Sequence, residues 1–231
     1  MIDVKEKIFS LKSSPQVSLV ESTKLSNIVI GARTCWQSFH KGGNYASSTN
    51  DISDADKQLL NRLLYKYRHE SVFEHVVYTF RIIGISRAVL QELARHRHIS
   101  LSVRSSRYTL KELRVEAPFR SLLDDASRAE KYVYFTGNVA VDGASLWALE
   151  NLRALVSEEI SNDIAKFALP ESYKTDLVLT CNLRELRHVL NLRLDKTALW
   201  AFRELARAMY DEIPEEHLFL FENVKDKLTL D

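Results

Sequence analysis

The amino-acid sequence predicts an α+β fold, in which a small mixed or antiparallel sheet is flanked by helices. Two patterns of apolar residues support this class: in some segments they recur at the helical period, and in others they alternate with polar residues as in a strand. The predicted helices and strands do not follow one another in regular alternation, as they would in a doubly wound sheet. A chain of 231 residues can form one well-buried core. With only six glycines and four prolines, it shows no linker. We therefore expect a single domain over residues 1–231.

The first half of the chain is expected to begin with a strand and to contain three helices. Ser53 is a suitable N-cap, because acidic residues follow it in the first turn. The alternation of Val, Phe and Tyr after Ser71 indicates a strand, which would put Phe73 and His75 on one face and Glu74 on the other. The expected elements are a strand at 16–21, a helix at 24–39, a turn-rich loop at 41–50, a helix from Ser53 to about His69, a strand at 72–80 and a helix at 85–98.

The second half is expected to be mostly helical. Pro170 should end a long helix, and Pro214 should separate the last two helical segments. The expected elements are a candidate strand at 132–135, a helix from about 145 to 167, a strand at 176–181 and three helical segments after it. Aromatic residues in these helices are expected to be core rather than part of a cofactor site: Trp147, Trp200, Phe202, Phe219 and Phe221.

Charge and cysteine content restrict the class of protein. The formal net charge is +1, from 32 basic and 31 acidic residues, so the whole chain is not a polycation built to coat nucleic acid or membrane. Only Cys35 and Cys181 occur, which fits a reducing compartment, and Cys35 is interpreted as a small buried hydrophobe. Residues 1–13 do not resemble a signal peptide, and no segment has the length of a membrane helix. We expect a soluble, cytoplasmic protein.

A basic segment at 95–107 is the densest chemical signal. It contains four arginines, two histidines and several serines, and it has no carboxylate. It reads either as a solvated basic turn or as a phosphate site, since arginine presents a planar fork of donors to phosphate oxygens.

Two further segments combine charge with apolar surroundings. Glu74 would either face water at a sheet edge or meet a polar ligand, because an unpaired acid on an apolar face is costly. The helix expected at 182–195 buries leucines on one side, and Arg193 falls at the edge of that side. Arg193 must therefore pair with an anion, reach out to water or end the helix. The segment 69–75 lacks HExxH spacing, and we expect no metal site.

Together these motifs resemble the flavin-dependent thymidylate synthases. The family signature is RHR, seven residues and Ser, found here as Arg95-His96-Arg97 followed by Ser105. HESVFEH at 69–75, ISRAVLQELARHR at 85–97 and NLRELRHVLNLR at 182–193 follow the order of the family.

The resemblance implies reductive methylation of dUMP to dTMP. Methylenetetrahydrofolate would supply the carbon, NADPH the electrons, and bound FAD would carry them. It also implies a homotetramer whose sites are assembled from several subunits, and a reaction without a cysteine nucleophile. No nucleic-acid or membrane partner is implied.

The site residues come from the same resemblance. Ser105, Ser106 and Arg107 would hold the dUMP phosphate, and Arg193 would be catalytic by favouring charge at N3 of the uracil. The remaining dUMP contacts would be Glu92, Arg95, Val103, Arg104 and Lys166. The FAD contacts would be Ser71, Glu74, Arg95, His96, Arg97, Val103, Asn182, Arg184 and His188.

Four of these positions depart from the usual pattern of the family. Val103 replaces a frequent Glu, so only its backbone could make a contact. Glu92 replaces Gln and would put a carboxylate near an anionic nucleotide unless it pairs with an arginine. Lys166 replaces Arg and loses the fork of donors, and His188 replaces Asn. The departures affect individual contacts rather than the class of reaction.

Two alternatives remain open at this point. One is a nucleic-acid-binding module that uses segment 95–107, although near-zero net charge and few neighbouring aromatics argue against it. The other is a flavin reductase of another class, which would oxidise NADPH without methylating dUMP.

Overall fold

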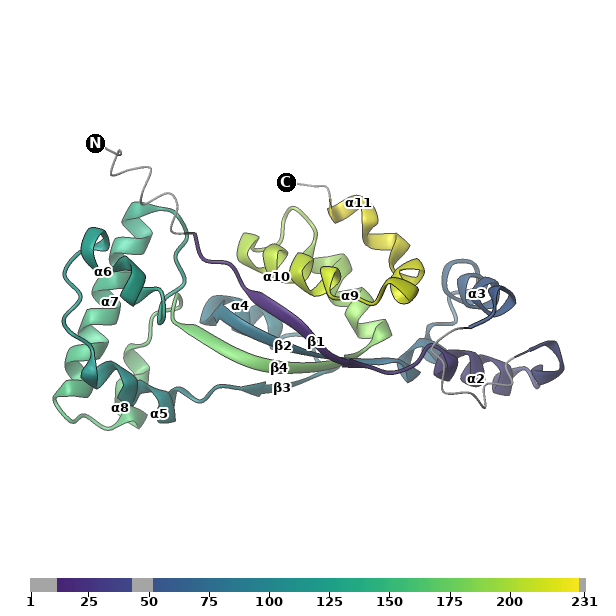
Figure 1. The fold of residues 1–231 in the computed structure, drawn as a ribbon, viewed down its shortest axis with the longest axis horizontal. Helices are drawn as coiled ribbons and strands as arrows, with labels where there is room; N and C mark the ends of the chain where they lie inside the picture. Colours follow the sequence, from purple (N-terminus) through teal and green to yellow (C-terminus); the bar gives the residue numbers. More distant parts are fainter. Residues whose placement is uncertain (1–11, 43–51, 229–231) are drawn as a thin grey trace. The chain divides into compact units, whose positions relative to one another are not determined.

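A computed structural model of the chain describes residues 12–42 and 52–228, without the side chain of Thr109. It confirms the α+β class, with helices and a small antiparallel sheet of four strands in the order β1-β2-β4-β3 (Figure 1). The strands are β1 (Gln16–Ser22), β2 (Val77–Ser86), β3 (Ile99–Val103) and β4 (Lys174–Asn182). Residues 1–11 and 43–50, to which the signal-peptide and most of the loop predictions apply, lie outside the described residues.

The chain forms two compact units, each built from separate stretches of sequence. The first unit consists of the described residues up to Gln16 together with Ile82–Arg95 and Ser102–Leu177. The second unit consists of Val17–Arg81, His96–Leu101 and the described residues from Val178 onward. Strands β2, β3 and β4 each contribute residues to both units. A single domain over 1–231 stays a prediction.

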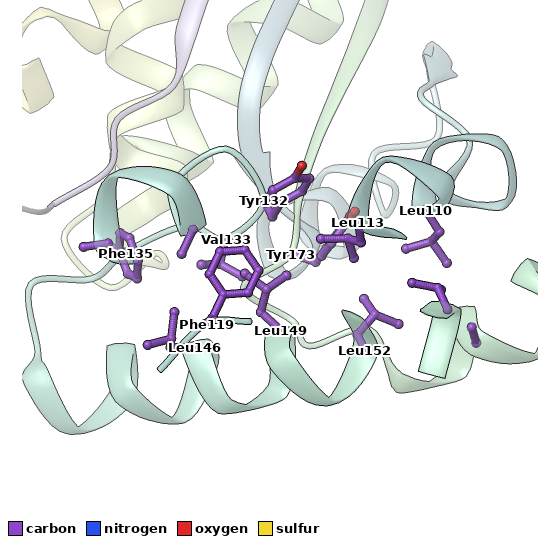
Figure 2. Packing of buried hydrophobic residues seen from close by; sticks show 14 residues of the cluster. Leu110, Leu113, Phe119, Tyr132, Val133, Phe135, Leu146, Leu149, Leu152 and Tyr173 are labelled. Carbon is purple, nitrogen blue, oxygen red and sulfur yellow. The ribbon is translucent and has the colours of Figure 1, made fainter. Parts of the chain in front are cut away.

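The first unit has its own apolar core around helix α7. The helix begins at the N-cap Asn138, whose side chain accepts hydrogen bonds from the backbone N–H groups of Ala140 and Val141. Leu146, Leu149 and Leu152 extend from α7 towards Phe119, Val133 and Tyr173 (Figure 2). The helices of this unit are α4 (Arg87–Leu93), α5 (Ser106–Thr109), α6 (Leu122–Ala129), α7 (Val139–Ser157) and α8 (Asn162–Ala165), with 3-10 segments η4 (Leu110–Val115) and η5 (Lys166–Ala168).

The second unit packs helices α9 and α10 against each other and the segment η3 against α2 and α9. Its α-helices are α2 (Ser26–Cys35), α3 (Asp54–Asn61), α9 (Leu183–Arg193), α10 (Trp200–Asp211) and α11 (Lys225–Leu228). Its other helical segments are the 3-10 helices η1 (Phe39–Lys41), η3 (Glu70–His75) and η6 (Glu215–Val224) and the π-helix η2 (Arg62–Lys66). Buried side chains of this unit include Tyr78, Phe202 and Phe221, each 0% exposed.

Several predicted elements are confirmed. The strands expected at 16–21 and 176–181 are β1 and β4, and the helix expected within 24–39 is α2. Ser53 is the N-cap of α3, and its hydroxyl accepts from the N–H of Asp56. Pro214 does separate α10 from the last helical segments.

The strand predicted at 72–80 is wrong at its start. Residues 70–75 form η3, and the strand begins only at Val77. The physical reason is visible in the burial of neighbours: Val72 and Phe73 are adjacent and both buried, which a strand with one core face does not allow. Phe73, Glu74 and His75 are therefore not arranged by strand alternation.

Three helical predictions also need correction. The helix expected at 85–98 ends at Leu93, and Ile99–Val103 form β3, in which Ile99 and Leu101 are half-buried between exposed serines. The helix expected at 145–167 is instead α7 followed by α8, and Glu159 between them has φ 61°. The helix predicted to reach His69 changes to π geometry at Arg62.

The candidate strand at 132–135 is not a regular strand: it makes an isolated antiparallel bridge, between Val133 and Tyr173.

Some burial predictions fail as well. Phe202 and Phe221 are core as predicted, whereas Trp147 is 68% exposed and Trp200 and Phe219 are half-buried. Cys35 is exposed rather than buried. No helix in the described part of the chain is long and apolar enough to cross a bilayer.

Candidate active site

Helix α9 presents a polar face to a cavity in the second unit. Its start is fixed by Asn182, whose side-chain oxygen accepts from the N–H of Glu185 at 2.8 Å. As the helical spacing predicts, the leucine face is buried: Leu183, Leu186, Leu190 and Leu194 are at most 1% exposed. Arg184 and His188 consequently face away from the core.

The cavity has a volume of about 490 Å³ and is lined mainly by polar side chains. Three predicted FAD contacts from α9 and its N-cap lie on it, together with Glu74 from η3. The lining residues are Leu64, Glu70, Phe73, Glu74, His98, Asn182, Arg184, Glu185, Arg187, His188, Asn191 and Asn223. A second cavity of about 350 Å³ shares Glu70 and Arg184 with the first, and Ser71 lines it.

Arg184 is the charged centre of this polar face. Its Nη1 lies 2.7 Å from Glu74 Oε1, and its Nε lies 3.3 Å from Glu70 Oε2. The hydrogen bond to Glu74 raises the pKa of Arg184 above its usual value. Glu74, for which the sequence left water or a polar ligand open, therefore meets a guanidinium of its own chain. All three side chains are about half exposed, so a ligand can reach them.

His96, the central residue of RHR, is buried next to Glu185 and contacts the half-buried Arg193. Its side chain is 4% exposed, and its Nδ1 lies 3.4 Å from the Glu185 carboxylate, which is 9% exposed. Its Nε2 accepts a 3.0 Å hydrogen bond from Nε of Arg193. The rings of His188 and Phe202 lie edge-on to His96, at 5.9 and 6.1 Å between centroids.

Arg193, which the sequence predicted to pair with an anion, reach water or end the helix, lies at the end of α9. It is the last residue of α9, and its guanidinium carbon lies 4.7 Å from the centroid of the Phe202 ring. A guanidinium over an aromatic face is stabilised by cation–π attraction. The helix therefore ends at Arg193, and an imidazole and a phenyl ring hold its half-buried side chain.

Apart from Arg97, which is exposed in the second unit, the remaining predicted residues lie in the first unit, where arginines of the basic segment pair with carboxylates from other segments of the chain. Nη1 of Arg104 lies 2.9 Å from Asp176 Oδ2, and Nη1 of Arg107 lies 3.3 Å from Asp163 Oδ1. Arg95, 75% exposed, lies 3.7 Å from Glu92, so the Glu92 departure does pair with an arginine. Segment 95–107 contains no acidic residue, but three of its arginines have carboxylates from outside the segment as neighbours in the structure.

The serines of this segment lie at the start of a short helix. Ser105 precedes α5 and Ser106 is its first residue, so both hydroxyls accompany Arg107 in one turn. Val103 is 38% exposed at the end of β3. Lys166 is half-buried at the start of η5.

The two units thus divide the predicted residues into two groups. The second unit holds eight of them, on η3, just before β3, or on α9 and its N-cap: Ser71, Glu74, His96, Arg97, Asn182, Arg184, His188 and Arg193. The first unit holds Glu92, Arg95, Val103, Arg104, Ser105, Ser106, Arg107 and Lys166.

Sequence reasoning missed three side chains that support these groups. Asp176 and Asp163 pair with Arg104 and Arg107, and no sequence signal pointed to them. Glu185 stands three residues after Asn182, a spacing typical of a capping box, which would have explained it as a helix-start residue. Its carboxylate faces His96 instead.

The two cysteines differ in their surroundings. Burial, with a further contribution from the charge of Glu185, raises the pKa of Cys181 to about 12, so its thiol is protonated at neutral pH. Cys35 lines the second cavity but is exposed.

Comparison with known proteins agrees with this arrangement. Residues 18–217 match the family model described as thymidylate synthase complementing protein. A flavin-dependent thymidylate synthase of Campylobacter jejuni is 50% identical over 212 residues, which are 92% of this chain and 98% of the relative. One from Wolinella succinogenes is 50% identical over 205 residues, covering 89% and 96% of the two chains.

A solved structure extends the agreement to three dimensions. The crystal structure of thymidylate synthase X from Helicobacter pylori with FAD and dUMP superposes with a TM-score of 0.83 at 44% identity. The match covers 93% of this chain and 99% of that chain. The sequence motifs, the fold and the relatives lead to one conclusion: the chain belongs to the family of flavin-dependent thymidylate synthases.

Proposed function

We propose that this protein catalyses the reductive methylation of dUMP to dTMP, with FAD as cofactor and methylenetetrahydrofolate and NADPH as co-substrates. The observation that carries the proposal is the setting of Arg193. Arg193 is the last residue of α9, the helix whose polar face lines the 490 Å³ cavity of the second unit, and its guanidinium is held by the buried His96 and by the Phe202 ring of α10. Relatives with FAD and dUMP in their crystals support both ligands.

The donors around the cavity suit a flavin dinucleotide. Asn182, Arg184 and His188 offer an amide, a guanidinium and an imidazole to one cavity, as a ligand with phosphates, hydroxyls and ring nitrogens requires. Because Arg184 is 51% exposed, it can exchange a glutamate for a phosphate without a buried charge being stranded. When bound, FAD would supply hydride transfer from NADPH. Ser71, Glu74, Arg95, His96, Arg97 and Val103 complete the proposed FAD contacts.

The nucleotide would be held by the turn at the start of α5. Ser105, Ser106 and Arg107 offer two hydroxyls and a guanidinium to the phosphate, and Arg107 would exchange the exposed Asp163 for it. Glu92, Arg95, Val103, Arg104 and Lys166 are the remaining proposed contacts. Arg104 differs from Arg107, because Asp176 and the carbonyl of Lys174 hold it in place.

Arg193 would act on the pyrimidine ring. A fixed guanidinium at the uracil edge stabilises the negative charge that develops at N3 when the ring accepts an electron pair, and in this way it makes the ring a better electrophile. The gain is greatest when the guanidinium is already oriented before the substrate arrives. The hydrogen bond to His96 and the Phe202 face provide this orientation.

We also propose a homotetramer and a cytoplasmic location. Unit one exposes large apolar side chains that a subunit interface would cover, among them Trp147 at 68%, Val115 at 88% and Phe167 at 89%. Cys35 and Cys181 are free thiols, as expected in a reducing compartment.

The test is turnover together with the flavin spectrum of the purified protein. We expect flavin absorbance that changes when dUMP is added, and dTMP formation with methylenetetrahydrofolate and NADPH. Arg193→Ala should abolish turnover while the flavin stays bound. NADPH oxidation without dTMP would indicate a reductase, and salt-sensitive oligonucleotide binding without flavin would indicate the nucleic-acid module.

A further inference from the structure

We propose that Glu185 is a positioning residue, which keeps the proton of His96 on Nδ1 so that Nε2 can accept from Arg193 and hold its guanidinium for the substrate. The proposal rests on the role proposed for Arg193 in turnover. Glu185 stands three residues after Asn182, which suggests a part in capping α9, but its carboxylate faces His96.

The proton on His96 is determined by its two neighbours. Nε of an arginine can only donate, so the 3.0 Å hydrogen bond from Arg193 requires a lone pair on Nε2. A neutral imidazole with a lone pair on Nε2 carries its proton on Nδ1. Nδ1 faces the Glu185 carboxylate at 3.4 Å, and a carboxylate only accepts. The three groups therefore form a directed chain, in which each donor meets an acceptor.

Burial makes this arrangement consequential. The side chains of His96 and Glu185 are 4% and 9% exposed, so water does not compete effectively for the ring nitrogens. Without Glu185 as acceptor, the proton would be free to move to Nε2. Two donors, Nε2–H and the Arg193 Nε–H, would then face each other, and the guanidinium would leave the Phe202 face.

A purely structural role for Glu185 predicts something different. Its backbone N–H already completes the cap by donating to Asn182, and the cap does not need the carboxylate. If the side chain only filled space, Glu185→Ala would lower stability without moving the His96 proton. The state of that proton therefore distinguishes the two roles, and it does so independently of activity.

The first experiment reads the proton directly. Protein labelled with ¹⁵N-histidine is examined by two-bond ¹H–¹⁵N correlation NMR, and the His96 signals are identified by their loss in His96→Gln. We expect a neutral ring with its proton on Nδ1 in the wild type. In Glu185→Ala we expect the signals to shift towards the Nε2–H form. A wild-type proton on Nε2, or an unchanged His96 in Glu185→Ala, would overturn the proposal.

The second experiment measures turnover in matched variants. In Glu185→Ala, kcat should fall by about tenfold to a hundredfold, as expected when a catalytic group loses its support, with flavin content and the KM for dUMP near wild type. Glu185→Gln keeps an oxygen that accepts from Nδ1–H, so its kcat should recover most of the loss. Equal losses in both variants, or wild-type kcat in Glu185→Ala, would refute the role.

A control variant separates positioning from stability. Asp142 is another buried carboxylate, in the first unit, where it accepts from the N–H groups of Thr136 and Gly137. Asp142→Ala should lower stability but leave the His96 signals and the kcat of the folded protein unchanged. If Glu185→Ala does not fold, the position of the His96 proton in the wild type and the kcat of Glu185→Gln still test the proposal. If the wild type forms no dTMP, the proposed function fails while the NMR result stands by itself.

Discussion

Replacing Phe202 by leucine tests whether the aromatic face under Arg193 contributes to catalysis. The guanidinium carbon lies 4.7 Å from the ring centroid, and the ring is 0% exposed, so the attraction acts away from water. Under these conditions a cation–π contact stabilises by about 1–2 kcal/mol. If that energy holds Arg193 in its reactive orientation, its loss should lower kcat by roughly fivefold to thirtyfold.

Phe221→Leu is the matched control for this measurement. Phe221 is also 0% exposed and packs edge-on against Tyr78 and Tyr210, at 6.4 Å between ring centroids in both cases. Both variants should lose about 1–2 kcal/mol of unfolding free energy in urea titrations. Only Phe202→Leu should slow dTMP formation per folded molecule. The reasoning is refuted if the two variants lose activity equally, or if Phe202→Leu loses none.

Two further predictions concern the cores of the two units. Leu149→Ala should cost about 3 kcal/mol of unfolding free energy, because Leu149 is 0% exposed in the core of the first unit. Val141→Ala, on the exposed side of the same helix, should change the unfolding free energy by less than about 0.5 kcal/mol. Urea denaturation followed by circular dichroism measures both, and similar costs would contradict the assigned core. Desolvation lowers the pKa of His217, which lies 2.7 Å from the Tyr78 hydroxyl, so the native state resists the proton that the unfolded chain accepts and stability should fall as the pH drops below about 6.5. Thermal unfolding between pH 5 and 8 should show this loss in the wild type and a smaller one in His217→Gln, and identical slopes would argue against it.

Much of the fold could be predicted where one pattern decided the local structure. The leucines of α9 repeat at the helical period, and all four are buried as expected. Ser53 combines a capping hydroxyl with acids in the next turn, and it is the N-cap of α3. Strand β4 alternates over its whole length, and the predicted strand lies inside it.

Other elements could not be predicted because two patterns competed. Val72 and Phe73 fit a strand by composition, but their joint burial requires a tight helical turn. At Ile99–Val103, apolar residues alternate with serines as in a strand, yet we interpret the segment only as part of the basic, serine-rich stretch after the helix, so no strand is predicted there. Glu159, with φ 61°, interrupts a helix in a segment without glycine or proline.

The site shows the same division. The sequence identified Arg193 as unusual because it lies beside a leucine face, and its neighbours in the structure explain it. The carboxylates Glu185, Asp163 and Asp176 were missed because their partners are distant in the sequence and belong to other elements. The spacing of residues within one segment does not show which residues of other segments will pair with them.

The way in which the chain is threaded has a consequence for biosynthesis. It crosses between the two units after residues 16, 81, 95, 101 and 177, so no continuous fragment corresponds to either of them. His96 and Arg193 are 97 positions apart, and contacts of such sequence separation form slowly. During translation His96 is made well before Arg193, so the hydrogen bond between them cannot form until synthesis has passed residue 193.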